Sequence, residues 1–347
     1  MSAPHKLQGL ILGTVILLAL IYSQDKISGI AHDSSSPGFY RELLWVAEKK
    51  NALLSSPAQT TIVGNSMAGY AFDESLYSRL SGKPTAILWK KGTASAWYYL
   101  LLKNLILPNK PPETVVVIFR DNILTRPELR VWGTYKGYLD ALAGPDTSLL
   151  DELAYLNHKN TAYYLSNYFP FFADRRIWRD LPKFKIQALI SKHLLGIGTD
   201  ELGASFYQVF TENGIRFPNV GDKTYYNSTI LNADRLRFEE NLSASFLPHI
   251  VELCRQNGIN LVAVRIQRLV DQQKLRDTDL VDQYIRQFSR YAKREGFYFI
   301  DFTGKPWLKR EHYSTNDHLT AVGKKQFTQV LYREIKRLML TVPSISH

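Results

Sequence analysis

The run of residues 114–119, TVVVIF, constrains the fold of this chain more than any other feature. Its apolar residues follow one another without alternation, so both faces of the strand must be buried, as in a parallel sheet with helices on either side. Shorter runs of this kind occur at 60–63, 85–89, 260–266 and 297–302, and helical patterns separate them. This alternation predicts an α/β fold, a three-layer sandwich around a parallel sheet of the flavodoxin-like type.

The helices expected around this sheet differ in pattern. One should run from about residue 38 to 54, after Ser36 and Pro37, and helical spacing continues from 94 to 105. The last helix should bury one apolar face, formed by Phe327, Val330, Leu331, Ile335 and Leu338. Residues 144–245 alternate less regularly and are rich in Tyr and Phe, which predicts a mostly helical insert.

The amino-terminal segment predicts where the domain resides. Residues 7–22 form an uncharged run of 16, preceded by Lys6. That is at the short end for a membrane-spanning helix and close to the apolar region of a secretory signal. We expect an uncleaved signal anchor, with a cleaved signal as the alternative. Lys6 places the amino terminus in the cytoplasm, so residues 1–36 are an anchor and linker, and 37–347 a single extracytoplasmic, periplasmic domain on the inner membrane.

The charge balance leaves several classes of partner open. The chain of 347 residues has 43 Lys and Arg against 32 Asp and Glu, a formal charge of +11. Such a balance suits nucleic acid, an anionic membrane or a polyanionic glycan, but export and the absence of a nucleic-acid-binding motif argue against nucleic acid. Residues 169–192 predict a basic, aromatic surface for lipid headgroups or glycan, and the alternative is a solvated helix face. The single cysteine, Cys254, excludes an intrachain disulfide.

Polar residues directly follow three of the predicted strands. They are Gly64-Asn65-Ser66, Lys91-Gly92-Thr93 and Arg120-Asp121-Asn122, and Asp317-His318 precedes the last helix. Ligands of open parallel sheets bind at the carboxyl ends of strands. A serine in a strand-to-helix turn and a histidine at the same edge are suited to nucleophile and general base. The alternative is an ordinary turn in which Ser66 caps a helix.

Serine, glycine, asparagine and histidine in this order resemble the SGNH (GDSL-like) hydrolase superfamily. Gly64 and Ser66 match its first block, Gly92 its second and His318 its last. The stretch 317–323, DHLTAVG, is similar to a membrane-anchored branch that includes the alginate O-acetylation proteins and the D-alanyl transfer protein of teichoic acid systems.

The resemblance implies a role for each matching residue. Ser66 would be the nucleophile and His318 its base, while the N–H groups of Ser66 and Gly92, with the side chain of Asn122, would form the oxyanion hole. A strict alignment puts Arg120 at the asparagine position, and either side chain can donate.

The acid that would orient the histidine is less clear from the sequence. Thr315 stands where the family has its acid, three residues before His318. Asp317 is then the nearest orienter and Asp301 the second, and a serine–histidine dyad without any acid is the third alternative.

The function expected from these features is serine-dependent acyl transfer. Ser66 would accept an acyl group, as an ester, and pass it to an envelope polysaccharide or glycolipid. The resemblance implies an integral membrane O-acyltransferase as partner. The alternatives are a carbohydrate esterase or lipase-like hydrolase with the same residues, and a non-catalytic assembly protein of an envelope system. The spacing of the histidines predicts that no metal is bound. The sequence has no glycine-rich phosphate-binding loop, so no cofactor is predicted.

Overall fold

The computed structural model of the chain describes the sheet and most of the helices around it. The residues described are 37–127, 129–131, 134–143, 148–156, 236–269, 278–305, 307–315 and 317–341. The contacts divide the chain into two compact units, and the larger one, residues 41–131, 135–158 and 226–347, contains the sheet. The predicted anchor at 7–22 and the basic, aromatic surface at 169–192 lie outside the described residues.

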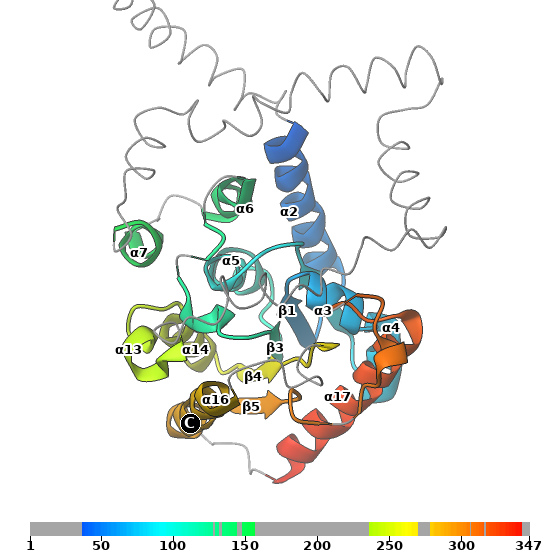
Figure 1. Cartoon of the computed structure of the whole chain (residues 1–347). Coiled ribbons are helices and arrows are strands. Elements are labelled where there is room, and N and C mark those ends of the chain that lie inside the picture. Colours follow the sequence, from blue (N-terminus) through cyan, green and yellow to red (C-terminus); the bar gives the residue numbers. More distant parts are fainter. Residues whose placement is uncertain are drawn as a thin grey trace, which may run out of the picture. The chain divides into compact units, whose positions relative to one another are not determined.

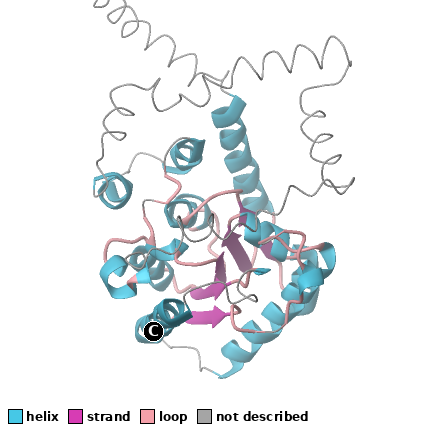
Figure 2. Cartoon of the chain, in the orientation of Figure 1, coloured by secondary structure: helices cyan, strands magenta, loops and turns pink. Residues whose placement is uncertain are grey.

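A parallel sheet forms the middle layer, as the apolar runs predict (Figure 2). Its order is β2-β1-β3-β4-β5, and every neighbouring pair is parallel. The strands are β1 (Thr60–Gly64), β2 (Thr85–Trp89), β3 (Thr114–Phe119), β4 (Asn260–Arg265) and β5 (Tyr298–Asp301). All residues of β1 and β3 are buried, which explains why these strands lack alternation.

Helices cover both faces of this sheet (Figure 1). One layer contains α3 (Ser66–Ala71), α4 (Glu74–Ser81) and α17 (Ala321–Thr341), and the other contains α5 (Ser95–Leu101), α14 (Leu247–Gln256) and α16 (Thr278–Glu295). The remaining helices are α2 (Pro37–Ser55), a π-helical turn (Leu102–Ile106), 3₁₀ turns (Ile123–Thr125 and Arg310–His312), α6 (Thr134–Ala143), α7 (Ser148–Leu150), a second π-helical turn (Asp151–Leu156) and α13 (Phe238–Leu242).

The pleat of β3 divides its side chains between the two layers. Val116 and Ile118 belong to the core cluster that includes α3 and α17, whereas Phe119 stacks on Phe288 of α16 with ring centroids 5.4 Å apart. Both sets of side chains are buried, and each packs against a different helical layer. The three-layer α/β prediction is confirmed in this respect.

Two helices show how the sequence patterns translate into packing. The apolar face expected on the last helix does pack into the core, with Leu338 at its margin. In α5, by contrast, every residue is buried, which is more than the helical spacing alone requires. The difference arises because α5 also contacts other helices. The ring centroids of Trp97 and of Trp45 in α2 are 5.8 Å apart, and those of Tyr99 and of Phe246, just before α14, are 5.5 Å apart.

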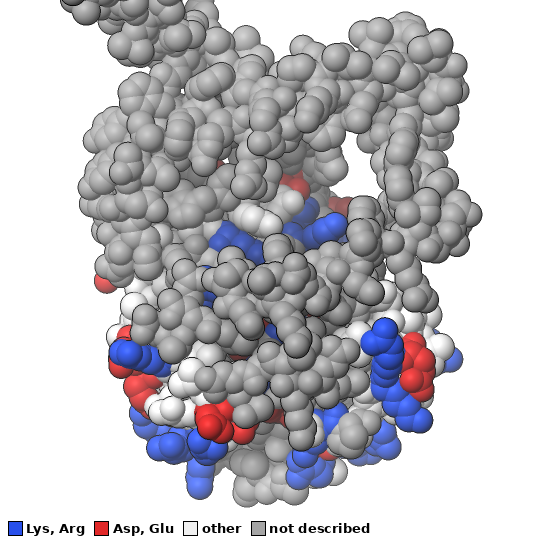
Figure 3. All heavy atoms as spheres, viewed as in Figure 1, with Lys and Arg blue, Asp and Glu red and all other residues white. Residues whose placement is uncertain are grey.

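Several charged side chains on the described helices pair with neighbours of opposite sign. On the face shown in Figure 3, Lys and Arg lie beside Asp and Glu near the lower rim. Arg255 pairs with Glu252, Arg294 with Glu295 and Arg337 with Glu334, each within one helix or at its end. In each of these pairs the arginine side chain is more than half exposed, so the pairs are solvated. Within the described part of the chain, no helix has the length and apolarity needed to cross a membrane.

Candidate active site

The turn between β1 and α3 places Ser66 at the carboxyl edge of the sheet. Ser66 is the first residue of α3, and Asn65 caps the helix because its Oδ1 accepts from the Met67 N–H at 3.0 Å. The Nδ2 of Asn65 donates to the Thr93 carbonyl at 3.4 Å, which ties this turn to the one after β2. A Cβ on Gly64 would lie 2.8 Å from the Ile118 carbonyl oxygen, so this turn requires glycine.

His318 meets Ser66 although 252 residues separate them in the chain. Its Nε2 lies 3.1 Å from the Ser66 Oγ, which is hydrogen-bonding distance. The segment that carries His318 is fixed by its backbone: the Ser314 N–H donates to the His318 carbonyl at 2.9 Å, and the His318 N–H donates to the Thr315 hydroxyl at 3.1 Å. The two residues predicted as nucleophile and base therefore form one pair.

The surroundings of His318 favour its neutral form. Burial lowers the pKa of His318 below its usual 6.5, the nearby Asp317 carboxylate raises it, and the charges of Arg120 and Lys91 lower it again. The net pKa is lowered, so the ring stays neutral to lower pH than a solvated histidine. A neutral imidazole is the form that can take a proton from serine.

Asp317 does not orient the imidazole as the sequence suggested. Its Oδ1 is 3.9 Å from Nε2, the nitrogen that faces Ser66, whereas an orienting carboxylate would bond Nδ1. Its Oδ2 instead accepts from Arg120 at 2.8 Å. Side chains of adjacent residues in an irregular segment point in different directions, which separates Asp317 from the Nδ1 edge of its neighbour.

Asp301, the second predicted orienter, is also bonded elsewhere. Its carboxylate accepts from the hydroxyl of Thr303 at 2.8 Å, and the guanidinium of Arg265 lies 3.4 Å away. Thr315, at the position of the family's acid, holds the backbone of His318 through its hydroxyl. Of the three alternatives, the geometry of the described residues fits a serine–histidine dyad.

Arg120 and Asn122, the two predicted side-chain donors, occupy different environments. Asn122 is completely buried and begins the 3₁₀ turn after β3, where its carbonyl accepts from the Thr125 N–H at 3.0 Å. The side chain of Arg120 is 13% exposed and reaches the His318 segment through Asp317. Arg120 is thus linked to the residue before His318, whereas Asn122 lies in the buried turn that follows the same strand.

Gly92 lies in the turn after β2, where the backbone admits little else. Its φ of +79° is in the left-handed region, and a Cβ would lie 2.6 Å from Cε1 of the Tyr135 ring. The Lys90 N–H donates to the Gly64 carbonyl at 3.3 Å, so this turn lies against the one that carries Ser66. Gly92 therefore lies in a turn that adjoins the one carrying Ser66.

Two buried arginines support this edge, and sequence reasoning missed both. Arg268 pairs with Asp121 at 2.9 Å, and both side chains are at most 2% exposed. Arg265, the last residue of β4, donates to the Asp121 carbonyl at 3.2 Å and to the Thr303 hydroxyl at 2.8 Å. The signal in the sequence was the presence of two arginines at the end of an apolar strand. A charge in such a position needs a buried partner.

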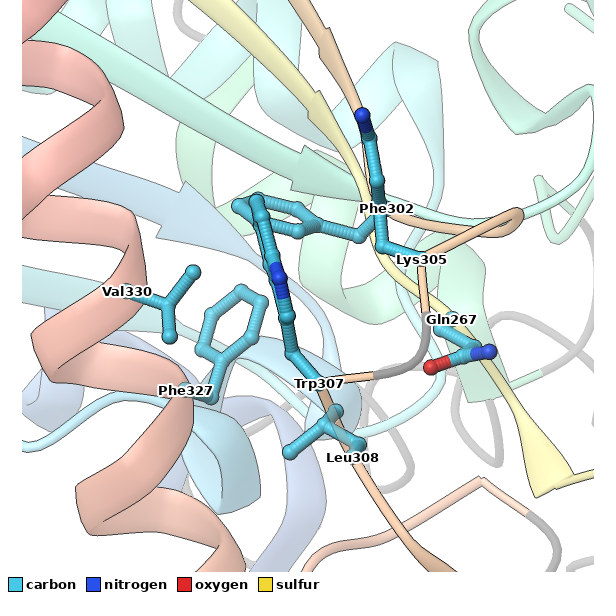
Figure 4. Close-up of a pocket in the computed structure, with 7 residues that line it drawn as sticks. All are labelled: Gln267, Phe302, Lys305, Trp307, Leu308, Phe327 and Val330. Atoms are coloured by element: carbon cyan, nitrogen blue, oxygen red, sulfur yellow. The ribbon is translucent and has the colours of Figure 1, made fainter.

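A small pocket lies elsewhere, between α17 and the segments that follow β4 and β5 (Figure 4). The side chains of Trp307 and Phe327 face each other across it, and neither Ser66 nor His318 lines it. Among the described residues, no three His, Cys, Asp or Glu side chains gather in a way that could hold a metal ion.

Several solved structures resemble this chain in fold. A candidate acylhydrolase from Bacteroides fragilis has a TM-score of 0.40 at 11% identity, covering 84% of this chain and 94% of its own. A candidate lipolytic protein of the G-D-S-L family from Desulfitobacterium hafniense gives 0.36 at 10%, covering 79% and 98%. An active-site mutant of a family two carbohydrate esterase from Clostridium thermocellum gives 0.38 at 9%, covering 83% and 65%.

No protein-family model and no curated protein matches the sequence. Because the TM-scores are below 0.5, the case for an activity rests on the residues of this chain.

Proposed function

We propose that this protein is an acyl-ester enzyme that works through Ser66. The observation that carries the proposal is the 3.1 Å separation between the Ser66 Oγ and the His318 Nε2. A hydroxyl at the amino end of a helix, facing an imidazole that burial keeps neutral, has the arrangement of an activated nucleophile and its base.

The reaction follows from the two side chains. The Ser66 Oγ attacks the carbonyl carbon of an ester, and its proton passes to the His318 Nε2. The tetrahedral intermediate collapses, the bond to the alcohol breaks, and the alcohol leaves with the proton that His318 held. The acyl group is then an ester of Ser66. A second hydroxyl, from water or a sugar, gives its proton to His318 and attacks this ester. The bond between the acyl carbon and the Ser66 Oγ then breaks, and His318 returns the proton to Ser66.

The oxyanion of the intermediate needs donors at the same edge. The N–H of Ser66 belongs to the first helical turn, where N–H groups have no acceptor within the helix. The Gly92 turn lies beside it. Loss of one such donor costs about 2.7–4 kcal/mol of transition-state stabilisation in serine enzymes.

The finer proposal is that the acceptor is a hydroxyl of an envelope polysaccharide or glycolipid, and the acyl group an acetyl. The support is the apolar run at 7–22, which predicts a periplasmic domain on the membrane, and the DHLTAVG stretch. An integral membrane O-acyltransferase that supplies the acyl group is the partner proposed with it. Hydrolysis by the same residues is the second candidate, favoured because the dyad can activate water as readily as a sugar.

A covalent probe tests the nucleophile directly. The full-length protein in detergent should be labelled by a fluorophosphonate at Ser66, and Ser66→Ala should lose the label. Ser55→Ala is the matched control, because Ser55 is an exposed serine at the end of α2. A well-folded wild-type protein without label at Ser66 would refute the proposal.

A second experiment separates transfer from hydrolysis. After a burst with p-nitrophenyl acetate, the acetyl-enzyme is mixed with buffer alone or with an envelope glycan. Faster loss of the acetyl group from the enzyme when the glycan is present, together with acetyl found on the glycan, would support transfer. Equal loss with and without glycan would support an esterase.

A reporter fused to the carboxyl terminus tests the topology. If a reporter that works only in the cytoplasm is active in this fusion, the periplasmic placement is refuted.

A further inference from the structure

We propose that Tyr70 is the positioning residue that holds the His318 imidazole against Ser66, in place of a carboxylate on Nδ1. The proposal rests on the proposed function, because it assigns the support of the same base. The observation behind it is a ring contact: the centroids of Tyr70 and His318 are 4.4 Å apart, with their planes inclined by 30°.

Helical spacing puts Tyr70 where this contact is made. Tyr70 follows Ser66 by four residues in α3, so the two side chains lie on the same face of the helix. The hydroxyl of Ser66 thus meets the Nε2 of His318 while the ring of Tyr70 lies on the imidazole. One short helix supplies both the nucleophile and a support for its base.

Tyr70 is itself supported by the neighbouring strand end. Its ring centroid lies 6.0 Å from that of Trp89, the last residue of β2. Gly69 makes this packing close, because a Cβ at that position would collide with the ring of Trp89. The order of contacts is therefore Trp89 to Tyr70 to His318. This series fixes the imidazole to the sheet without any acid.

The carboxylates near the site are bonded to other groups. In a triad, an acid on Nδ1 fixes the tautomer and rotation of the ring. Here Asp317 accepts from Arg120, which anchors the residue before His318 but leaves the rotation of the ring unset. An aromatic ring in contact with the imidazole limits that rotation, since a turned imidazole would lose the contact between the two inclined rings.

The same contact shields one face of His318 from water. The charged groups whose fields reach the imidazole are Asp317 beside it, Arg120 after β3 and Lys91 after β2. On α3, Ser66 and Tyr70 complete the surroundings. Removal of the Tyr70 ring therefore exposes the imidazole while these charges stay in place.

The test compares Tyr70→Leu with Tyr70→Phe in the full-length protein. Fluorophosphonate labelling of Ser66 should slow about tenfold in Tyr70→Leu, with the probe concentration for half-maximal rate unchanged, whereas Tyr70→Phe stays within about twofold of wild type. The acid limb of the pH profile should move to higher pH in the leucine variant only. Tyr332→Leu removes another aromatic contact, to Tyr77, and should label like wild type.

An NMR titration of the His318 ring reports on the same contact without any catalysis. In the Tyr70→Leu variant, the His318 imidazole should titrate at higher pH than in the wild-type protein. Its signals should also lose the ring-current shift that the Tyr70 ring causes. Equal labelling and equal titration in wild type and Tyr70→Leu would overturn the inference. If the two proteins differ in the NMR titration but the wild-type protein is not labelled by the fluorophosphonate, the proposed function is refuted and the ring contact is established.

Discussion

Replacement of Asp121 by Asn tests whether the buried ion pair with Arg268 supports the edge of the sheet that carries the site. Asp121 has a φ of +51°, and asparagine tolerates this left-handed conformation about as well as aspartate. The substitution keeps the shape of the side chain and removes its charge. The guanidinium of Arg268, with 1% of its side chain exposed, then loses the carboxylate 2.9 Å away.

The expected cost follows from burial. Removal of one partner from a buried ion pair destabilises a protein by about 3–5 kcal/mol, because the remaining charge stays out of water. An exposed ion pair with a similar N···O distance contributes only about 0–1 kcal/mol to the free energy of unfolding. The chain offers such a pair in Lys83 and Glu113, which are 2.7 Å apart with side chains 50% and 56% exposed. Asp121→Asn should therefore cost about 3 kcal/mol more than Glu113→Gln.

Urea unfolding followed by circular dichroism measures both free energies under the same conditions. Total stabilities are about 5–15 kcal/mol, so a loss of this size moves the midpoint clearly. The slope of the free energy with urea should be the same in both variants. If Asp121→Asn and Glu113→Gln lie within 1 kcal/mol of each other, burial of the pair does not stabilise this edge as argued.

Three further predictions concern single residues. Burial is the main cause that lowers the pKa of His318, and the charge of Lys91 adds to it, so labelling should persist below pH 6.5 and Lys91→Gln should move the acid limb to higher pH. Gly92→Ala should slow the labelling of Ser66 by a factor of about 10²–10³, because the Gly92 N–H that would bind the oxyanion shifts. Gly82→Ala is the control, since Gly82 also has a positive φ but lies in open space. It should lower the free energy of unfolding by only about 1–2 kcal/mol and leave the labelling rate unchanged. Burial raises the pKa of Cys254 to about 12, so a maleimide should modify it only after unfolding, and modification of the native protein would contradict this.

The sheet could be predicted because its signal is local. The run TVVVIF at 114–119 needs cover on both faces, and the structure gives it neighbours on both sides and a helical layer on each face. The complete burial of α5 could not be read in the same way. Its outer face is covered by α2 and by Phe246, and contacts between segments so far apart leave no periodic trace in the sequence.

Ser66 could be predicted because it follows a strand at the edge where ligands of parallel sheets bind, and His318 because it matches the last block of the family that the sequence resembles. The partners of His318 could not, because they depend on the directions of single side chains. Asp317 is next to His318 in the chain and yet bonds Arg120. Tyr70 was missed, although its spacing of four from Ser66 could have indicated it.

The arginines near the dyad are each paired with a carboxylate, and this affects how a reaction there would be stabilised. Arg120 faces Asp317, Arg268 faces Asp121, and Arg265 faces Asp301. Arg120 and Asp317 are 2.8 Å apart and act on the imidazole in opposite directions, so burial is the largest influence on its pKa.

The first step of acyl transfer would nevertheless create two charges, an imidazolium and an oxyanion. Paired arginines offer the oxyanion little free charge, because each is already attracted to its own carboxylate. The stabilisation must then come from N–H groups that are oriented before the reaction, at Ser66 and Gly92. This explains why the turns that carry them allow so little substitution, with glycine required at 64 and at 92.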